Sequence, residues 1–226
     1  MAPAQNLAVG LTNGFPPDQY DDESGHLVGL DVELAEALFR QIGEKPLIIR
    51  DSWDNIVGSL RRHLNISIAG GMEISDERLG LFDFSVPVYR RRGVLVVAAS
   101  NKAVNGIGDL DGKKITGDSG TWIQKRLEKA QAEHGLRLIV TRTKEEAMGM
   151  LASGRVDACL MPEAVAIYLA RKLGLAIRCI DIGDSGSQVA FGFAKGNTDL
   201  VARVNAGLSA MAAKGELAAI LARWLK

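Results

Sequence analysis

The segment with the clearest potential for chemistry is Gly-Gly-Met-Glu-Ile-Ser-Asp-Glu-Arg, residues 70–78. An apolar run before it predicts a strand ending at Gly70-Gly71, where the lack of side chains lets a ligand approach the backbone N–H groups closely. Ser75 is a suitable N-cap for the next turn and would fix Arg78 near its start. A guanidinium held in this way grips a carboxylate through two parallel hydrogen bonds. We therefore predict a carboxylate-binding site. The alternative is a surface turn in which the arginine pairs with a nearby aspartate (Asp76 or Asp83).

The elements that must position these residues follow an α/β pattern, because short apolar strands alternate with amphipathic helices over most of the chain. A helix over 31–42 is predicted to have Asp31 as its N-cap and to end at Gly43. Thr143 to Glu146 forms a capping box that predicts the start of another helix. The remaining predicted strands are 7–11, 46–50, 66–69, 114–117, 138–141, 156–161 and 176–181. The remaining helices are 52–60, 121–134, 163–173 and two closing helices that are split at Gly215.

Two extended apolar segments, Val94 to Ala99 and Gln188 to Phe193, interrupt this alternation. If both cross between lobes, residues 1–91 and 190–226 form the first lobe and residues 92–189 the second. The hinge then lies near 90–93 and 187–191. A chain that leaves a lobe and returns makes a double-strand hinge, and ligands favour the cleft between hinged lobes.

The composition narrows the classes of function. Lys and Arg balance Asp and Glu at 27 each, so no overall charge favours nucleic acid or an anionic membrane. No apolar run approaches the ~18 residues of a membrane span, and residues 1–5 lack the features of a signal peptide. The three histidines cluster neither together nor with the two cysteines, so we expect no metal and no cofactor. Two buried thiols are the expected state of Cys159 and Cys179; a disulfide within one lobe is the alternative.

Several segments together resemble one family, the amino-acid-type periplasmic solute-binding proteins (family 3, type II periplasmic-binding fold). The resemblance covers nearly the whole chain. It implies a two-lobed α/β fold with a double-strand hinge, which closes around a small solute. The matching segments are Gly29 to Ala35, Trp53 to Ile56, Gly71 to Arg78, Phe84 to Tyr89, Ser119 to Thr121, Phe191 to Gly196 and Leu217 to Trp224.

The resemblance also implies roles for individual residues. Phe15 and Trp53 match the aromatic walls around the ligand's side chain. Gly71 and the residue after Met72 match the positions that hold the ligand's α-ammonium and α-carboxylate, and Arg78 matches the carboxylate clamp. Thr121 and Trp122 match the helix start in the second lobe that completes the carboxylate site. Unpaired amides and the helix dipole favour an anion at such a helix start.

Three positions depart from the family pattern. The family commonly has Ser or Thr after the methionine, where this chain has Glu73. It usually places the ammonium-binding Asp where this chain has Pro162, so Glu163 would have to reach back to substitute. Trp122 replaces a small or hydroxylic residue. Two interpretations remain open. In one, Glu73 has taken over the ligand's ammonium and the ligand is still an amino acid or amine; in the other, α-amino recognition is lost and the ligand is a different small acid, or there is none. A third possibility is that Glu73 neutralises Arg78.

We therefore predict a monomeric, non-enzymatic, periplasmic or extracellular protein that binds an amino acid or related carboxylate and delivers it to a membrane permease of the ABC type. The main alternative is the ligand-sensing domain of a membrane histidine kinase or a related receptor, with its signalling modules in the same chain. The cyclohexadienyl dehydratases are an enzymatic relative, but Val165 stands where their catalytic Glu would fall. An aliphatic side chain cannot donate a proton.

Overall fold

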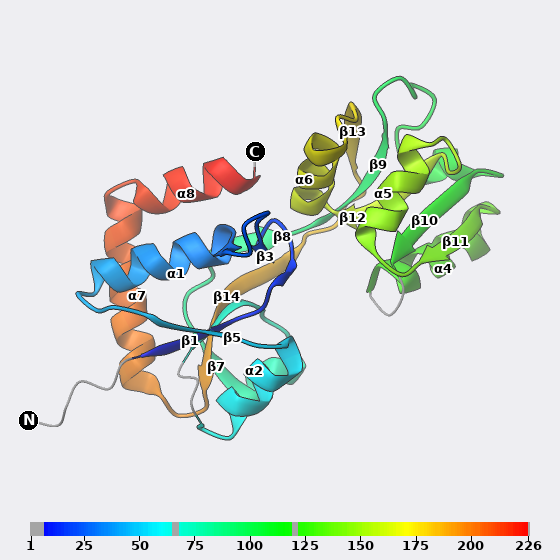
Figure 1. Ribbon diagram of the computed structural model, residues 1–226. Coiled ribbons are helices and arrows are strands. Elements are labelled where there is room, and N and C mark those ends of the chain that lie inside the picture. The colour runs from blue at the N-terminus through cyan, green and yellow to red at the C-terminus, as the bar shows by residue number, and fades with distance from the viewer. Residues whose placement is uncertain (1–6, 65–67, 119–121, 226) are drawn as a thin grey trace, which may run out of the picture. The chain divides into compact units, whose positions relative to one another are not determined.

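The computed structural model describes residues 7–64, 68–118 and 122–225, and the chain divides into two compact α/β units (Figure 1). Unit 1 contains Met1–Arg90 and Ser187–Lys226, and unit 2 contains Arg91–Gly186. The chain therefore passes from one unit to the other twice. Within the described residues, no helix is both long and apolar enough to cross a membrane.

Unit 1 is built on a mixed sheet with the order β5-β1-β6-β14-β7, in which β8 also pairs with β14. β1 runs parallel to both of its neighbours, whereas β14 is antiparallel to β6 and β7. The strands are β1 (Ala8–Leu11), β5 (Leu47–Arg50), β6 (Ile68–Glu73), β7 (Phe82–Phe84), β8 (Tyr89–Arg91) and β14 (Ser187–Ala194).

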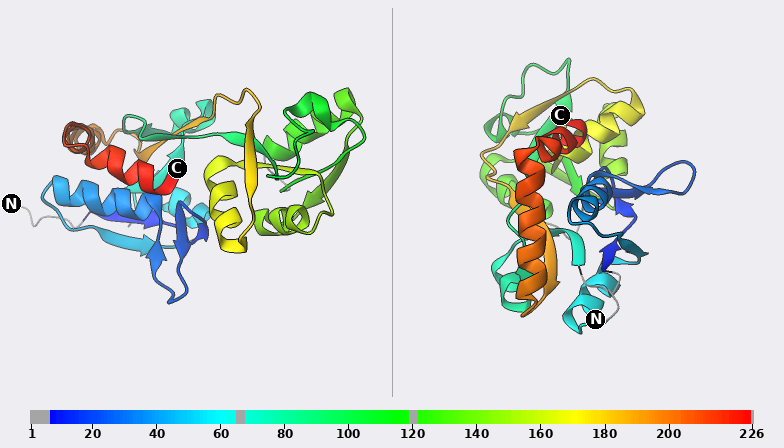
Figure 2. Two further views of the ribbon diagram at one scale, coloured as in Figure 1. Left: turned by 90° about the horizontal axis from the view of Figure 1, so that it is seen from above. Right: turned by 90° about the vertical axis from the view of Figure 1, so that its left-hand side faces the viewer.

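Helices cover both faces of this sheet because the strands are apolar on both sides. The helices are α1 (Leu30–Gln41), α2 (Trp53–Arg61), α3 (Asp76–Leu81), α7 (Thr198–Ala213) and α8 (Glu216–Leu225). On one face, α1, α7 and α8 pack together around Phe39, Val204 and Ile220 (Figure 2). On the other face, Ile56 and Leu60 of α2 pack against the sheet. Each face therefore has its own hydrophobic core.

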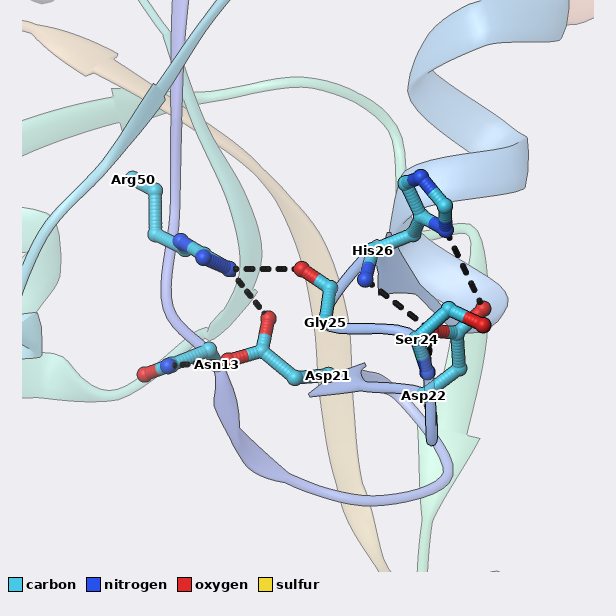
Figure 3. Close-up of polar contacts among 7 residues, drawn as sticks. All are labelled: Asn13, Asp21, Asp22, Ser24, Gly25, His26 and Arg50. Atoms are coloured by element: carbon cyan, nitrogen blue, oxygen red, sulfur yellow. Dashed lines mark hydrogen bonds and ion pairs between the residues drawn. The ribbon is translucent and has the colours of Figure 1, made fainter.

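A small antiparallel sheet between β1 and α1 was not predicted from the sequence. It consists of β2 (Gly14–Phe15), β3 (Gln19–Asp21) and β4 (Leu27–Val28). Arg50 at the end of β5 forms an ion pair with Asp21 and donates a hydrogen bond to the Gly25 carbonyl, 3.4 Å away (Figure 3). The hydrogen bonds from Asn13 and Arg50 hold the pKa of Asp21 below its usual range. These contacts fasten the small sheet to the main one.

Unit 2 has a five-stranded sheet with the order β11-β10-β12-β9-β13. α4 packs on one face, and α5 and α6 pack on the other. The strands are β9 (Gly93–Ala98), β10 (Lys114–Asp118), β11 (Arg137–Thr141), β12 (Ala158–Pro162) and β13 (Ile177–Asp181). The helices are a 3₁₀ turn at Ile107–Leu110, α4 (Trp122–His134), α5 (Lys144–Ala152) and α6 (Glu163–Leu173). The predicted cap of α5 is confirmed, since the Glu146 N–H donates to the Thr143 hydroxyl at 3.1 Å.

Two local predictions were wrong. Gly29, not Asp31, is the N-cap of α1, and Asp31 lies inside the first turn with its side chain buried. β6 does not end at Gly70-Gly71 but continues to Glu73. It does so through a β-bulge, because the pairing with β14 shifts between Ala190 and Gly192 and sets both glycines opposite Phe191.

The alternative of a disulfide within one lobe is also excluded. Cys159 of β12 and Cys179 of β13 pair with Val96 from opposite sides of β9. Two strand spacings of about 4.8 Å separate their backbones by roughly 10 Å, beyond the ~7 Å limit of a disulfide. Both thiols are free. Burial raises the pKa of both, that of Cys179 to about 11, which makes them unreactive.

Candidate functional site

The candidate site in unit 1 lies where the parallel strands β5, β1 and β6 end. The chain runs from β1 through α1 to β5 on one side of β1, and then through α2 to β6 on the other side. The carboxyl ends of β1 and β6 therefore form a topological switch point, where open α/β sheets bind their ligands. Predicted site residues follow all three strands: Phe15 after β1, Trp53 after β5, and Glu73 and Arg78 at and after the end of β6.

Arg78 is held by its own helix start and by the strand end before it. The Ser75 hydroxyl caps α3 and accepts the Arg78 N–H at 3.3 Å, as the sequence predicted. The Arg78 guanidinium donates to the backbone carbonyl of Glu73 at 2.9 Å. Asp83, one of the suggested surface partners, pairs with Lys195 instead. Among the residues that the structure describes, no carboxylate forms an ion pair with Arg78.

The two predicted aromatic walls follow β1 and β5, the two strands on one side of the sheet that end at this site. Trp53 is the first residue of α2, which the Ser52 side chain caps by accepting the Asn55 N–H. Its ring is half-buried against the α2 core, and the Arg78 guanidinium lies 5.8 Å from the ring centroid. A cation at that distance over an indole is attracted by the ring. Phe15 is half-buried and pairs with Gln19 in the small sheet.

The Gly70-Gly71 segment packs on a buried polar group that the sequence did not single out. Gly71 has φ +65°, and a Cβ there would lie 2.0 Å from Asp31 Oδ2. The Gln19 side chain donates to this same oxygen at 2.7 Å and to the Gly70 carbonyl at 3.2 Å. A glycine is thus required here both for the backbone conformation and for the space. The only sequence signal was Asp31 in the family motif.

In unit 2, β10 and β12 repeat the arrangement of β1 and β6, with β11 on the far side of β10. Thr121 lies outside the described residues, and Trp122 is the first residue of α4. Pro162 ends β12, and Glu163 begins α6. Pro162 and Glu163 thus lie at the carboxyl end of β12, and Trp122 opens the helix that follows β10, so they belong to the second switch point of the chain.

Glu163 is engaged by an arginine that the sequence analysis missed. Arg92 donates from Nε and Nη2 to the two carboxylate oxygens of Glu163, at 2.7 and 3.0 Å. Its Nη1 lies 3.7 Å from Asp181. The hydrogen bonds to Glu163 raise the pKa of Arg92. A bidentate pair of this kind fixes both side chains.

The structure also has a pocket that lies away from these strand ends. A pocket of about 410 Å³ in unit 2 lies between α6 and β13, lined mainly by apolar residues such as Ile167, Leu175 and Ile177, and includes none of the predicted site residues. In the described part of the chain, no three His, Cys, Asp or Glu side chains are grouped as metal ligands would be.

Comparison with known proteins gives relatives along the full length. The L-cystine-binding protein TcyJ of Escherichia coli K12 is 29% identical over 220 residues, which cover 96% of this chain and 82% of the relative. The second substrate-binding domain of Lactococcus lactis GlnP, in an open conformation, has a TM-score of 0.86 at 25% identity and covers 99% of this chain and 97% of that one. A histidine kinase sensor domain (TM-score 0.76, 98% and 96% coverage) is 22% identical, a likeness of fold alone.

These likenesses confirm the predicted fold, the two-lobed type II periplasmic-binding-protein fold. The family model of the bacterial extracellular solute-binding proteins, family 3, matches residues 7–226. The chain therefore belongs to that family of solute-binding proteins.

Proposed function

We propose that this protein binds an amino acid outside the cytoplasm, without changing it chemically, and delivers it to an ABC-type membrane permease. The observation that carries the proposal is the environment of the Arg78 guanidinium. Its guanidinium is half-buried at the switch point and is oriented by a backbone carbonyl, and it has no carboxylate partner among the described residues. It therefore keeps donors for the carboxylate of a ligand. Relatives that bind cystine or arginine support the same ligand class.

Glu73 is the group that we assign to a cationic part of the ligand. The competing carboxylate, Glu163, already has both oxygens bonded to Arg92. The Arg78 guanidinium donates a hydrogen bond to the backbone carbonyl of Glu73 and so lies beside this residue. A half-buried carboxylate beside the Gly70-Gly71 backbone is well suited to an ammonium or guanidinium group. We propose that the protein acts as a monomer in the periplasm or at the cell surface.

A thermal-shift screen of amino acids, cystine, amines and small organic acids tests this function. A true ligand at about 100 times its Kd stabilises the protein by about 2.7 kcal/mol. Arg78→Ala should weaken the binding of any carboxylate hit roughly ten- to a hundredfold, as expected for a lost charged hydrogen bond of about 1.5–3 kcal/mol. Arg61→Ala, an exposed arginine in the last turn of α2, is the matched control.

Three results would contradict the proposal. If the strongest hit binds equally well to the Arg78→Ala variant, this residue does not hold the ligand's carboxylate. If amines bind and no amino acid does, the ligand class is wrong. If mass spectrometry detects steady conversion of a bound compound into a product, the protein is an enzyme rather than a binding protein.

A further inference from the structure

Gln19 occupies the place where β1 and β6 separate. The parallel pairing of these strands ends at Gly10 and Ala69, one step before the glycine pair. Beyond that point the Gln19 amide joins the two strands. Its Oε1 accepts the Thr12 N–H at 2.8 Å, and its Nε2 donates to the Gly70 carbonyl at 3.2 Å. The Gln19 side chain thus takes the place of the next pair of backbone hydrogen bonds between the two strands.

The Gln19 side chain is itself fixed by a buried polar cluster. It is 3% exposed and also donates to Asp31 Oδ2 at 2.7 Å. The other oxygen of Asp31 accepts from the Tyr89 hydroxyl at 3.1 Å, and this hydroxyl lies 3.3 Å from Asp18 Oδ2. Gln19, Asp31, Asp18 and Tyr89 are all less than a tenth exposed. Buried amides and carboxylates that satisfy one another in this way rigidify their surroundings.

The Gly71 backbone fits this cluster closely. The missing Cβ leaves the space that the Asp31 carboxylate and the Gln19 amide occupy, since a Cβ would meet them at 2.0 and 2.6 Å. At the opposite edge, Phe191 does not fix the glycines, because its N–H and C=O bond to Ser85. On the β1 side the cluster therefore contacts both glycines, and the Leu11 side chain packs against Gly70.

We propose that Gln19 is a positioning residue for ligand binding: its amide, oriented by Asp31, sets the path of the Gly70-Gly71 backbone. Gln19 is placed to act through this backbone, not by touching the ligand, since its amide is buried and has three partners. The link to ligand binding rests on the proposed function. The link to the backbone path stands on the contacts alone.

The first experiment measures the backbone conformation of the two glycines in the absence of any ligand. In Gln19→Met, a side chain of similar length loses all three hydrogen bonds. We expect the backbone ¹H–¹⁵N signals of Thr12, Gly70 and Gly71 to shift strongly in the full-length protein. Asn205→Ala is the control, because it removes another side-chain bond in unit 1, the one accepted from the Val86 N–H at 2.8 Å. Unchanged signals of the two glycines in a folded Gln19→Met protein would overturn the proposal.

A second variant distinguishes a local effect on the glycines from a general loss of protein stability. Gln19→Glu keeps the acceptor for Thr12 but replaces the donor with a carboxyl group beside Asp31. Burial and the neighbouring carboxylate should raise the pKa of the new group. The glycine signals should then approach the wild-type positions at low pH and depart from them as the pH rises through that pKa. Signals that do not respond to pH would contradict the assignment of Gln19 as the donor.

The binding arm uses L-arginine and L-cystine as probes in calorimetric titrations. We expect Gln19→Met to weaken binding at least tenfold while Asn205→Ala leaves it within twofold. Shifted glycine signals with unchanged affinity would overturn the positioning role. If neither probe binds the wild-type protein, the proposed function fails for these ligands. The backbone signals alone then decide whether Gln19 sets the glycine path.

Discussion

At the scale of single residues, the site depends on how charges are partnered. Arg92 and Glu163 satisfy each other in unit 2, whereas the Arg78 guanidinium in unit 1 has only a carbonyl and an indole ring as described partners. An ion pair between two partly exposed side chains adds little stability. We propose that its effect is on specificity, because a Glu163 with both oxygens bonded to Arg92 is not available to a cationic group of the ligand.

This distribution of charge leads to a prediction for Glu73. Glu73→Gln keeps the shape of the side chain and removes its charge. Because every amino acid carries an ammonium group, the affinities for L-arginine, L-lysine and L-glutamine should all fall about ten- to a hundredfold. Calorimetric titration measures each affinity. Glu77→Gln, an exposed carboxylate on α3, alters the net charge equally and serves as the control. A uniform gain for all amino acids would instead make Glu73 a filter against carboxylates.

At the scale of elements, the site depends on how strands end. The two glycines of β6 form a β-bulge, and α3 begins shortly after the strand with Ser75 as its N-cap. Bulges re-aim the residues that follow them. The bulge and the cap together direct Glu73 and Arg78, which are five residues apart, so that the guanidinium of one meets the backbone carbonyl of the other.

Gly71→Ala should therefore be costly for two separable reasons. Forcing alanine into the left-handed region costs about 1–2 kcal/mol, and the new Cβ would collide with Asp31 Oδ2. Gly43→Ala isolates the first cost, because Gly43 has φ +73° and nothing lies within 4 Å of an added Cβ. We expect Gly71→Ala to lower the free energy of unfolding by clearly more than Gly43→Ala, as measured by urea denaturation. Equal losses would show that the Asp31 contact is easily displaced.

The difference between what the sequence predicts and what the structure has is clearest for the helices and strands. The buried strands and the helices with one apolar face were predicted because burial imposes their periodicity. The small sheet β2-β3-β4 was missed, since strands of two or three residues with mixed polarity carry no such period. Asp31 was misassigned as a cap because its type suits a cap, whereas its role depends on Gln19, a distant residue that no local pattern identifies. The ligand contacts of Phe15, Trp53 and Thr121 stay predictions.

At the scale of the whole molecule, two units with separate cores are joined by two chain crossings. Each unit contributes one switch point, between β1 and β6 in unit 1 and between β10 and β12 in unit 2. Residues in both were assigned to one ligand from the sequence. A ligand that contacts both units stabilises the conformation in which both sets of contacts form.

Hydrogen exchange with and without ligand tests this assignment for each unit separately. We expect a saturating amino acid ligand to slow exchange in β6 and α3 of unit 1 and also in the first turn of α4 in unit 2. Both regions should respond because local opening then requires loss of the ligand. With Arg78→Ala at the same ligand concentration, both effects should disappear together. α7, far along the chain from either switch point, reports any global effect. If protection is confined to unit 1, the assignment of Thr121 and Trp122 to the ligand is wrong, and binding by unit 1 alone would explain the data.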